Sequence, residues 1–218
     1  MKKILYLPSW YPDRDNPIIG SFFREQALLA QQHYDVKVLA VQSRELKALR
    51  WLRAVLAAGG LSETVDGSDV LPPDCIRYRH LLPKKKYQSA FTWRWQLRLL
   101  QRHVAALQQQ GWQPDVIHAH SLFGAGLFVE PLARACGAKS VLTEHDSFNL
   151  HRLPPFYQQR AMETLKRVDV LASVSQHLAN ILATHGAARR IHVCGNLVDA
   201  SRFRLRDEPG ETFSVLHV

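Results

Sequence analysis

Cysteine is scarce in this sequence, and its placement excludes two classes of small protein. The 218 residues include three cysteines, Cys75, Cys136 and Cys194, which lie far apart and form no CxxC pair. A zinc ribbon needs paired cysteines, and a disulfide framework needs an even set of them. A reducing cytosol therefore suits the chain best, and its length is enough for one large domain with a sizeable core.

Long hydrophobic runs are also missing. The apolar stretch at 4–7 stops at Pro8, well short of the roughly 7 to 15 residues that form the core of a signal peptide. The longest uncharged apolar run, 116–129, contains two histidines and is shorter than the ~18 residues that suggest a spanning helix. We therefore expect that no segment crosses a membrane.

Several well-known motifs are absent. The sequence contains no GxGxxG, no glycine followed by Lys and Ser or Thr, and no GxSxG. These absences argue against the dinucleotide fingerprint, the P-loop and the nucleophile elbow of serine hydrolases. The chain is nevertheless typical of a folded globular protein, since 46% of its residues are hydrophobic and 22% are charged.

The net charge of +9 is unevenly distributed. The stretch 75–114 holds eight basic residues and no acidic residue, which leaves 20 basic against 19 acidic residues elsewhere. This stretch is a candidate surface for an anionic partner. No helix-turn-helix, RNP or zinc-finger pattern accompanies it, so we do not expect a nucleic-acid partner.

Apolar runs alternate with helical patterns along the chain. The predicted strands are 3–7, 35–41, 76–82, 115–119, 139–143, 168–174 and 190–194, and the predicted helices are 21–33, 44–58, 92–110, 123–136, 155–166 and 175–185. This alternation predicts an α/β fold with a Rossmann-like, doubly wound, mainly parallel sheet that has helices on both faces. Such a sheet binds its ligands at the carboxyl ends of its strands.

Polar residues follow three of the predicted strands. His118 and His120 end the fourth strand and point the same way because they are two residues apart, and His145 and Asp146 follow the fifth. A neutral imidazole there can take a proton, hold a sugar hydroxyl or bind a metal, although a hydrogen-bonded core histidine is the simpler alternative. Asn196 lies in the turn after the last strand.

A glycine opens the first predicted helix. Gly20 and Ser21 follow the polar loop after the first strand, and amides at a helix start favour phosphate or another anion. The alternative is a turn glycine with Ser21 as the helix cap.

Taken in order, these motifs resemble the N-terminal domain of family-4 glycosyltransferases of GT-B architecture. The matching segments are Ser-Trp-Tyr-Pro at 9–12, Gly-Ser-Phe-Phe-Arg-Glu-Gln at 20–26, Asp-Val-Ile-His-Ala-His at 115–120, Thr-Glu-His-Asp at 143–146, Val-Ser at 174–175 and the stretch 196–203. The opening is most similar to bacterial enzymes that build capsular, teichuronic or other extracellular polysaccharides.

The resemblance implies a retaining transfer of a sugar from a nucleotide-sugar donor to a glycan or lipid-linked acceptor, with no metal or other cofactor. It places His120 at the transferred sugar as the catalytic residue. Gly20, Ser21, His118, His145, Asp146 and Asn196 then become the candidate substrate-binding residues. The cysteine usage and the basic stretch lead us to expect a cytoplasmic protein that is peripheral on the inner face of the plasma membrane.

Within that family, this chain corresponds to one half of the GT-B fold. We expect residues 1–205 to form the N-terminal, acceptor-side domain, and 206–218 to form the linker and first strand of a donor-binding domain that the chain does not contain. We therefore expect this half alone to bind acceptor but to transfer little or no sugar.

The basic stretch gives a further expectation. Lys84, Lys85 and Lys86 precede a predicted helix in which Arg94, Arg98 and Arg102 form a stripe beside a buried face. This stripe suits anionic headgroups or a lipid diphosphate, and a solvated helix is the alternative. The predicted helix 44–58, in which leucines lie beside Arg50 and Arg53, is a second and weaker membrane candidate.

Two other functions stay open at this point. His118, His120 and His145, with Asp146 nearby, are the ligand types of a metal-dependent hydrolase, although no spacing among them completes a known site. The second open function is that of a non-catalytic domain that binds carbohydrate or anions.

Overall fold

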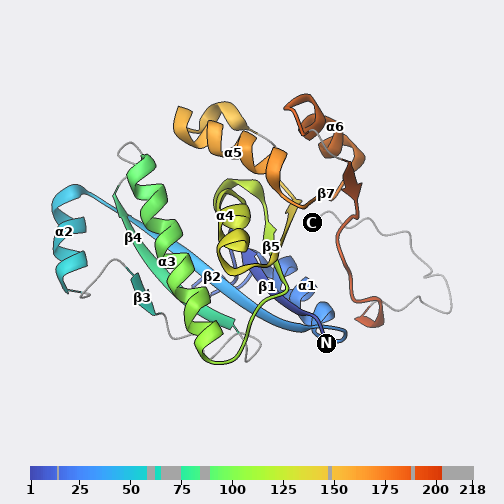
Figure 1. The fold of residues 1–218 in the computed structure, drawn as a ribbon, viewed down its shortest axis with the longest axis horizontal. Helices are drawn as coiled ribbons and strands as arrows, with labels where there is room; N and C mark the ends of the chain where they lie inside the picture. Colours follow the sequence, from blue (N-terminus) through green and yellow to red (C-terminus); the bar gives the residue numbers. More distant parts are fainter. Residues whose placement is uncertain are drawn as a thin grey trace, which may run out of the picture.

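The computed structural model describes residues 1–13, 15–57, 62–64, 75–83, 89–146, 149–187 and 190–202, which form an α/β unit built on one eight-stranded sheet. The strand order is β3-β4-β2-β1-β5-β6-β7-β8, with β1 in the interior of the sheet (Figure 1). All neighbouring strands are parallel except β3 and β4, which are antiparallel. The predicted doubly wound, mainly parallel sheet is confirmed.

The elements follow one another in the predicted alternation. The strands are β1 (Lys3–Pro8), β2 (Asp35–Leu46), β3 (Ser62–Thr64), β4 (Cys75–Pro83), β5 (Val116–His120), β6 (Lys139–Glu144), β7 (Val170–Ser173) and β8 (Ile191–Val193). The helices are α1 (Ser21–Gln31), α2 (Ala48–Ala57), α3 (Ala90–Gln109), α4 (Leu127–Cys136), α5 (Pro155–Arg167) and α6 (Gln176–Thr184). Short helical turns occur at η2 (Leu122–Gly126), η3 (Leu150–Arg152) and η4 (Ala200–Arg202).

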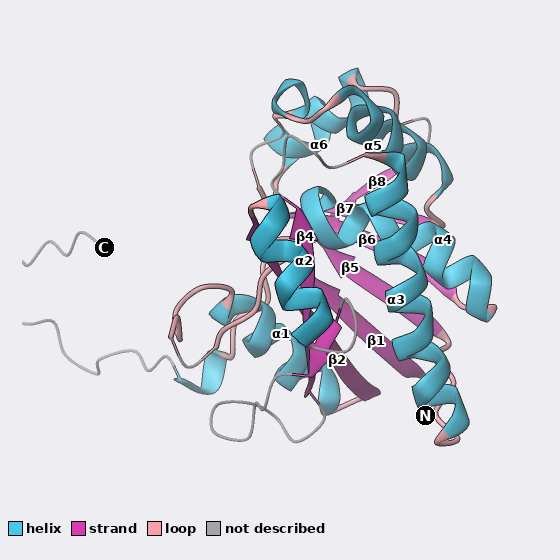
Figure 2. Cartoon of the chain, turned by 90° about the vertical axis from the view of Figure 1, so that its left-hand side faces the viewer, coloured by secondary structure: helices cyan, strands magenta, loops and turns pink. Residues whose placement is uncertain are grey.

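Helices cover both faces of the sheet, as Figure 2 shows for α1 on one side and α3 on the other. The side chains of β1 alternate between the two layers. Leu5 and Leu7 belong to the larger core cluster under α3, α4, α5 and α6, whereas Tyr6 belongs to a smaller cluster with Phe23 of α1. This two-residue alternation places successive side chains of β1 on opposite faces of the sheet.

Two predicted boundaries are wrong. The helix expected from residue 44 begins only at Ala48, because β2 continues to Leu46 and stays paired with β4 as far as Pro83. The helix expected from residue 123 begins regularly at Leu127, because Phe123 and Gly124 have non-helical backbone angles inside η2. The three-residue edge strand β3 was not predicted.

The expected linker and first strand of a second domain, at 206–218, lie outside the described residues. In the part of the chain that the structure describes, no helix combines the length and the hydropathy that crossing a bilayer requires.

Candidate functional site

The carboxyl ends of three neighbouring strands bring the predicted histidines together. Pro8 of β1 pairs with His120 of β5, and His120 pairs with Thr143 of β6. His145 follows β6 directly. Because parallel strands end at the same edge of the sheet, the two histidines of β5 and the histidine after β6 meet there.

The three imidazoles form one compact cluster. The rings of His118 and His120 are stacked with their centroids 4.2 Å apart, and His120 Nδ1 lies 3.1 Å from His145 Nε2. His118 Nε2 lies 2.8 Å from the hydroxyl of Thr143. The predicted common orientation of His118 and His120 is confirmed.

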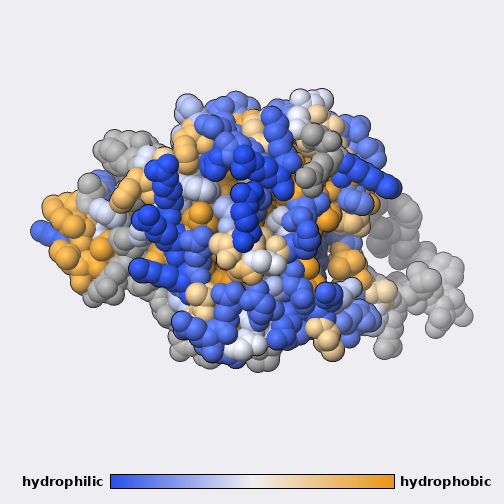
Figure 3. Space-filling model, viewed as in Figure 1, coloured by the Kyte–Doolittle hydropathy of each residue, from blue (hydrophilic) through white to orange (hydrophobic). Residues whose placement is uncertain are grey.

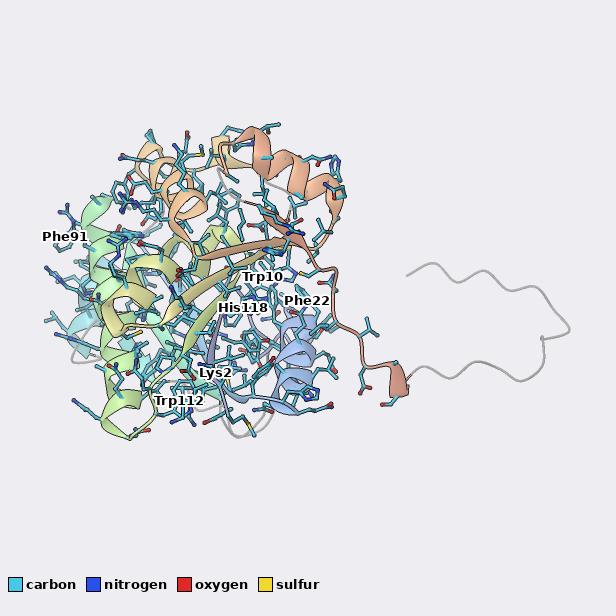
Figure 4. The ribbon with its side chains drawn as sticks, turned by 45° about the vertical axis from the view of Figure 1, so that its right-hand side comes forward. Lys2, Trp10, Phe22, Phe91, Trp112 and His118 are labelled. Carbon is cyan, nitrogen blue, oxygen red and sulfur yellow. The ribbon has the colours of Figure 1, made fainter. Side chains whose placement is uncertain are left out.

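Aromatic rings enclose this histidine cluster. Tyr6 lies 4.9 Å from His120 between ring centroids, and Phe23 lies 5.0 Å from both His120 and His145. Phe22 lies 5.5 Å from His145. Figure 4 shows His118 in the interior of the molecule and Phe22 on the α1 side. The first turn of α1 is therefore part of the wall of the site.

Burial keeps the cluster uncharged. It lowers the pKa of His118 to about 3 and that of His145 to about 4, and it holds the pKa of His120 well below its usual value. For His118 and His120, repulsion from neighbouring histidines adds to the effect. A neutral imidazole carries one N–H donor and one acceptor nitrogen. The cluster can therefore donate and accept hydrogen bonds without carrying charge at neutral pH.

Two nitrogen atoms of the cluster have no hydrogen-bond partner. His120 Nε2 and His145 Nδ1 are both buried and unpaired, while the other nitrogens of these two rings face each other. If His120 Nδ1 donates to His145 Nε2, then His120 Nε2 is an acceptor and His145 Nδ1 is a donor. If His145 Nε2 donates instead, these two roles are exchanged. The pair thus offers one donor and one acceptor, whichever tautomers are present.

The histidine cluster does not provide a metal site. Within the described ranges, no group of three His, Cys, Asp or Glu side chains is arranged to hold a metal ion. The ring nitrogens that face each other in His120 and His145 are engaged in their mutual contact. The metal-dependent hydrolase considered from the sequence therefore has no ligand set here.

A buried carboxylate fixes the loops around the histidines. Glu144 accepts hydrogen bonds from the amides of Leu122 (2.7 Å), His145 (3.0 Å) and Asp146 (3.0 Å). Burial raises the pKa of Glu144, although the three amides oppose this rise. In the sequence, Glu144 stands out only as part of the Thr-Glu-His-Asp motif. An acidic residue that ends a buried strand is the signal that could have identified its role.

The loop after β5 is strained and closely packed. Ser121 has a positive φ of 67°, which is uncommon for a residue with a side chain, and its hydroxyl is buried without a partner. Ser9 Oγ lies 2.8 Å from the carbonyl oxygen of His120 and accepts a hydrogen bond from the amide of Ala125 at 3.0 Å. A Cβ atom at Gly124 would lie 2.8 Å from Ser9 Oγ, so only glycine fits there.

Gly20 is the N-cap of α1 and has a left-handed backbone, with φ 74°. Its carbonyl accepts a hydrogen bond from the amide of Phe23 at 3.0 Å, and the amide of Ser21 donates to the carbonyl of Ile18 at 3.1 Å. The Ser21 amide is thus already engaged, contrary to the expectation that both amides at 20 and 21 face a phosphate. That expectation now applies to Gly20 alone.

Replacement of Gly20 by alanine is expected to cost at least about 2 kcal/mol of folding stability. The new Cβ would lie 2.8 Å from the carbonyl oxygen of Trp10, in addition to the left-handed strain. Gly137→Ala is the matched control, because Gly137 has φ 73° but open space around its Cβ, so about 1 kcal/mol is expected. Urea denaturation of both variants measures the difference, and equal losses would contradict the close approach of Trp10.

The remaining predicted substrate residues lie at the edge of the histidine cluster. The side-chain amide of Asn196 lies near His145, whose pKa it raises against the larger effect of burial, and its oxygen accepts a hydrogen bond from Gln26 of α1 at 3.4 Å. Asp146 is exposed, and its amide is bound to Glu144. Gln26 was not singled out from the sequence, although it ends the Gly-Ser-Phe-Phe-Arg-Glu-Gln segment.

A cavity of about 270 Å³ opens over the carboxyl ends of β1, β2 and β4, on the side of the sheet that α3 and α4 cover, whereas the histidine cluster lies on the α1 side. Its walls are mainly apolar, with Leu7, Leu82, Leu100 and Phe128 among them. Its polar lining includes Ser43, Glu45, His80, Gln96 and Tyr157. Burial, and the neighbouring His103, lower the pKa of His80 to about 3, so this ring is neutral. None of these lining residues was predicted from the sequence to belong to a site.

The basic residues predicted to contact anions lie apart from the histidine cluster. Arg94, Arg98 and Arg102 are exposed on α3, while Trp93, Leu100 and Val104 of the same helix are buried. The predicted division of α3 into a packed face and a basic stripe is confirmed. Lys84, Lys85 and Lys86 lie outside the described residues.

The sequence matches a known protein family. Residues 26–202 match the family model described as Glycosyltransferase Family 4. No curated protein sequence matches.

Solved structures share the fold. The catalytic domain of Starch Synthase IV from Arabidopsis thaliana superposes with a TM-score of 0.51 at 12% identity, over 92% of this chain and 52% of that chain. An alpha,alpha-trehalose-phosphate synthase from Burkholderia xenovorans superposes with a TM-score of 0.51 at 10% identity, over 82% of this chain and 41% of that chain. The chain thus spans about half the length of the solved structures that it matches.

Proposed function

Because the chain belongs to Glycosyltransferase Family 4, we propose that it forms the acceptor-side half of an enzyme that transfers a sugar from a nucleotide-sugar donor to a glycan or lipid-linked acceptor, with retention of anomeric configuration. The observation that carries the proposal is the buried, neutral histidine pair at the carboxyl ends of β5 and β6. Its two unpaired nitrogens, His120 Nε2 and His145 Nδ1, match the donor and acceptor character of a sugar hydroxyl.

His120 acts by orienting the transferred sugar rather than by accepting a proton. Burial holds its pKa so low that protonation at neutral pH would be costly. A buried polar atom without a partner costs about 1 to 3 kcal/mol, and a bound hydroxyl would remove that cost. Because both nitrogens are buried, a sugar reaches them only if a covering side chain, such as that of Phe22 or Phe23, moves.

The donor's nucleotide diphosphate is held mainly by a second domain. The chain spans about half of its solved neighbours, which supports an enzyme built from two such halves. On this side, the amide at Gly20 would contribute to binding the phosphates at the N-terminus of α1. The nucleotide sugar is a co-substrate, and the proposal includes no metal or other cofactor.

The cavity over the carboxyl ends of β1, β2 and β4 receives the acceptor. Carboxylate, amide, imidazole and hydroxyl groups are suited to hold sugar hydroxyls, and Glu45, Gln96, His80 and Ser43 supply them. The apolar walls suit the carbon faces of a sugar or an attached lipid. The Gln96 side chain is buried at the wall of this cavity.

The similarity of the opening residues to extracellular-polysaccharide enzymes supports a hexosyl transfer in polysaccharide biosynthesis on the cytoplasmic side of the membrane. The exposed basic stripe of α3 supports contact with an anionic surface.

Substitution of His120 tests the proposal directly. His120→Asn retains an atom in the place of Nδ1 but removes Nε2, so we expect the transfer rate to fall about 100-fold while the melting temperature changes little. The assay follows transfer of labelled sugar from nucleotide sugars by the complete reading frame that contains this chain. His192→Asn, an exposed histidine of β8, is the control and should retain full activity.

Two outcomes would contradict this assignment. If His120→Asn lowers stability and activity in parallel, His120 is a structural residue. If residues 1–218 alone transfer sugar at the rate of the complete protein, the assignment of this chain to one half of the enzyme is wrong.

A further inference from the structure

Helix α2 leaves an apolar face uncovered. Its leucines Leu49, Leu52 and Leu56 are 63%, 50% and 72% exposed. They lie on one side of the helix, because the spacing of three and four residues matches the helical turn. Figure 3 shows the resulting hydrophobic cluster at the left-hand end of the molecule, where Figure 1 places α2. Three exposed leucines on one short helix are more than scattered surface apolar residues.

The other side of α2 is fixed to the sheet. The indole nitrogen of Trp51 donates a hydrogen bond to the carbonyl oxygen of Leu81 in β4 at 3.0 Å. Val55, one turn further on, is half-buried. The anchored face holds the leucines outward, so their exposure is a property of the fold and not of a loose helix.

Positive charge surrounds the leucines. Arg50 and Arg53 are exposed on α2, beside the leucine face. Helix α3, which is separated from α2 by β4 in Figure 1, adds the exposed stripe of Arg94, Arg98 and Arg102. Neither helix contains an acidic residue.

An exposed aromatic side chain adds to this surface. Phe91, in the first turn of α3, is 71% exposed and projects away from the body of the molecule (Figure 4). Aromatic and leucine side chains beside arginines are the composition of helices that lie in a membrane interface.

We propose that the leucine face of α2, together with Phe91 and the arginine stripe of α3, is a docking surface for an anionic lipid bilayer. The ten residues of α2 are too few to span a bilayer, so the helix would lie in the headgroup region with its leucines among the acyl chains. The arginines would contact anionic headgroups. A second copy of the chain is a poorer occupant, because it would place like charges of the same stripe together.

The docking surface lies beside the cavity. Ser43 and Glu45 line the cavity at the end of β2, just before α2 begins, and Gln96 lines it from α3. A docked molecule would therefore hold the cavity close to the lipid headgroups. If the proposed function is correct, on which this step rests, the acceptor is a membrane lipid or a lipid-linked glycan rather than a soluble sugar.

Vesicle sedimentation of the 218-residue chain tests the docking surface. We expect binding to vesicles that contain phosphatidylglycerol, weaker binding at high salt, and little binding to phosphatidylcholine alone. The double variant Leu52→Gln/Leu56→Gln should bind at least about tenfold more weakly. Ile18→Gln/Ile19→Gln is the matched control, because it removes two exposed apolar side chains elsewhere without changing the charge.

Three results would overturn the docking proposal: no binding to phosphatidylglycerol vesicles at low salt, equal binding by the α2 variant and wild type, or equal loss in the Ile18/Ile19 control. A dimer in light scattering that the α2 variant abolishes, without vesicle binding, would assign the surface to a second copy. Melting curves confirm that both variants are folded.

The vesicle experiment and the transfer assay fail independently. Vesicle binding needs no nucleotide sugar, so binding without sugar transfer by the complete protein contradicts only the proposed function. Transfer to a soluble glycan without vesicle binding contradicts only the docking surface.

Discussion

Acidification from pH 6.5 to about pH 5.5 is expected to remove about 3 to 5 kcal/mol of folding stability from this chain. Burial lowers the pKa of five histidines. The pKa is about 3 for His80 and His118 and about 4 for His103 and His145. For His120 it lies well below the usual value. They stay neutral when folded but become protonated when the chain unfolds below pH 6.5. Their stabilisation is therefore complete above pH 6.5 and is lost as the pH falls toward 4.

Each buried histidine contributes about 1 kcal/mol over that interval, and typical domains have only about 5 to 15 kcal/mol in total. Urea titrations at several pH values measure the effect. His103→Asn should reduce the loss between pH 6.5 and pH 5.5 by up to about 1 kcal/mol, because less than one full proton fewer is taken up on unfolding in that interval. His33→Asn, an exposed histidine, is the control. A wild-type stability that stays flat from pH 7 to pH 5 would contradict the prediction.

Replacement of Glu144 is expected to be the most destabilising change near the site. Glu144→Ala removes the acceptor for three amides, one of them on fully buried Leu122, and we expect a loss of about 3 to 5 kcal/mol. Thermal or urea denaturation measures this loss.

The isosteric variant separates hydrogen bonding from packing. In Glu144→Gln, one carboxylate oxygen becomes an NH₂ group, which is a donor. Because each oxygen of Glu144 accepts from a backbone amide, the NH₂ group must face the N–H of either Leu122 or His145. We therefore expect it to lose nearly as much stability as Glu144→Ala. Glu163→Gln, on the surface of α5, is the control and should cost less than about 1 kcal/mol. A Glu144→Gln variant as stable as wild type would show that the three amides contribute little.

The sequence predicts the parallel sheet well because its strands are short apolar runs buried on both faces. Runs such as Val116–His120 and Lys139–Glu144 differ from the predicted ranges by a single residue at the ends. The errors arise where tertiary pairing overrides local pattern. β2 extends through the polar residues Arg44 and Glu45 because β4 pairs with them, and no local preference shows this.

Part of the candidate site could also be predicted. The spacing of His118 and His120, and the position of His145 after the next strand, place them at one edge of a parallel sheet. The contact of these histidines with Phe22 and Phe23 depends on how α1 packs against the sheet. The positions of the histidines in the sequence do not reveal that packing. The uncovered leucines of α2 could not be predicted either, because the pattern of an amphipathic helix indicates an apolar face but not what covers it.

The position of β1 in the sheet has a consequence for synthesis on the ribosome. β1 can pair with β2 early, since Lys3 aligns with Asp35, but its other neighbour, β5, begins only at Val116. Until that segment leaves the exit tunnel, one edge of β1 has no strand to pair with, and such edges invite pairing with other chains. The nascent chain is therefore most vulnerable to aggregation while residues between β2 and β5 are being translated. A chaperone that covers open strand edges would act in that interval.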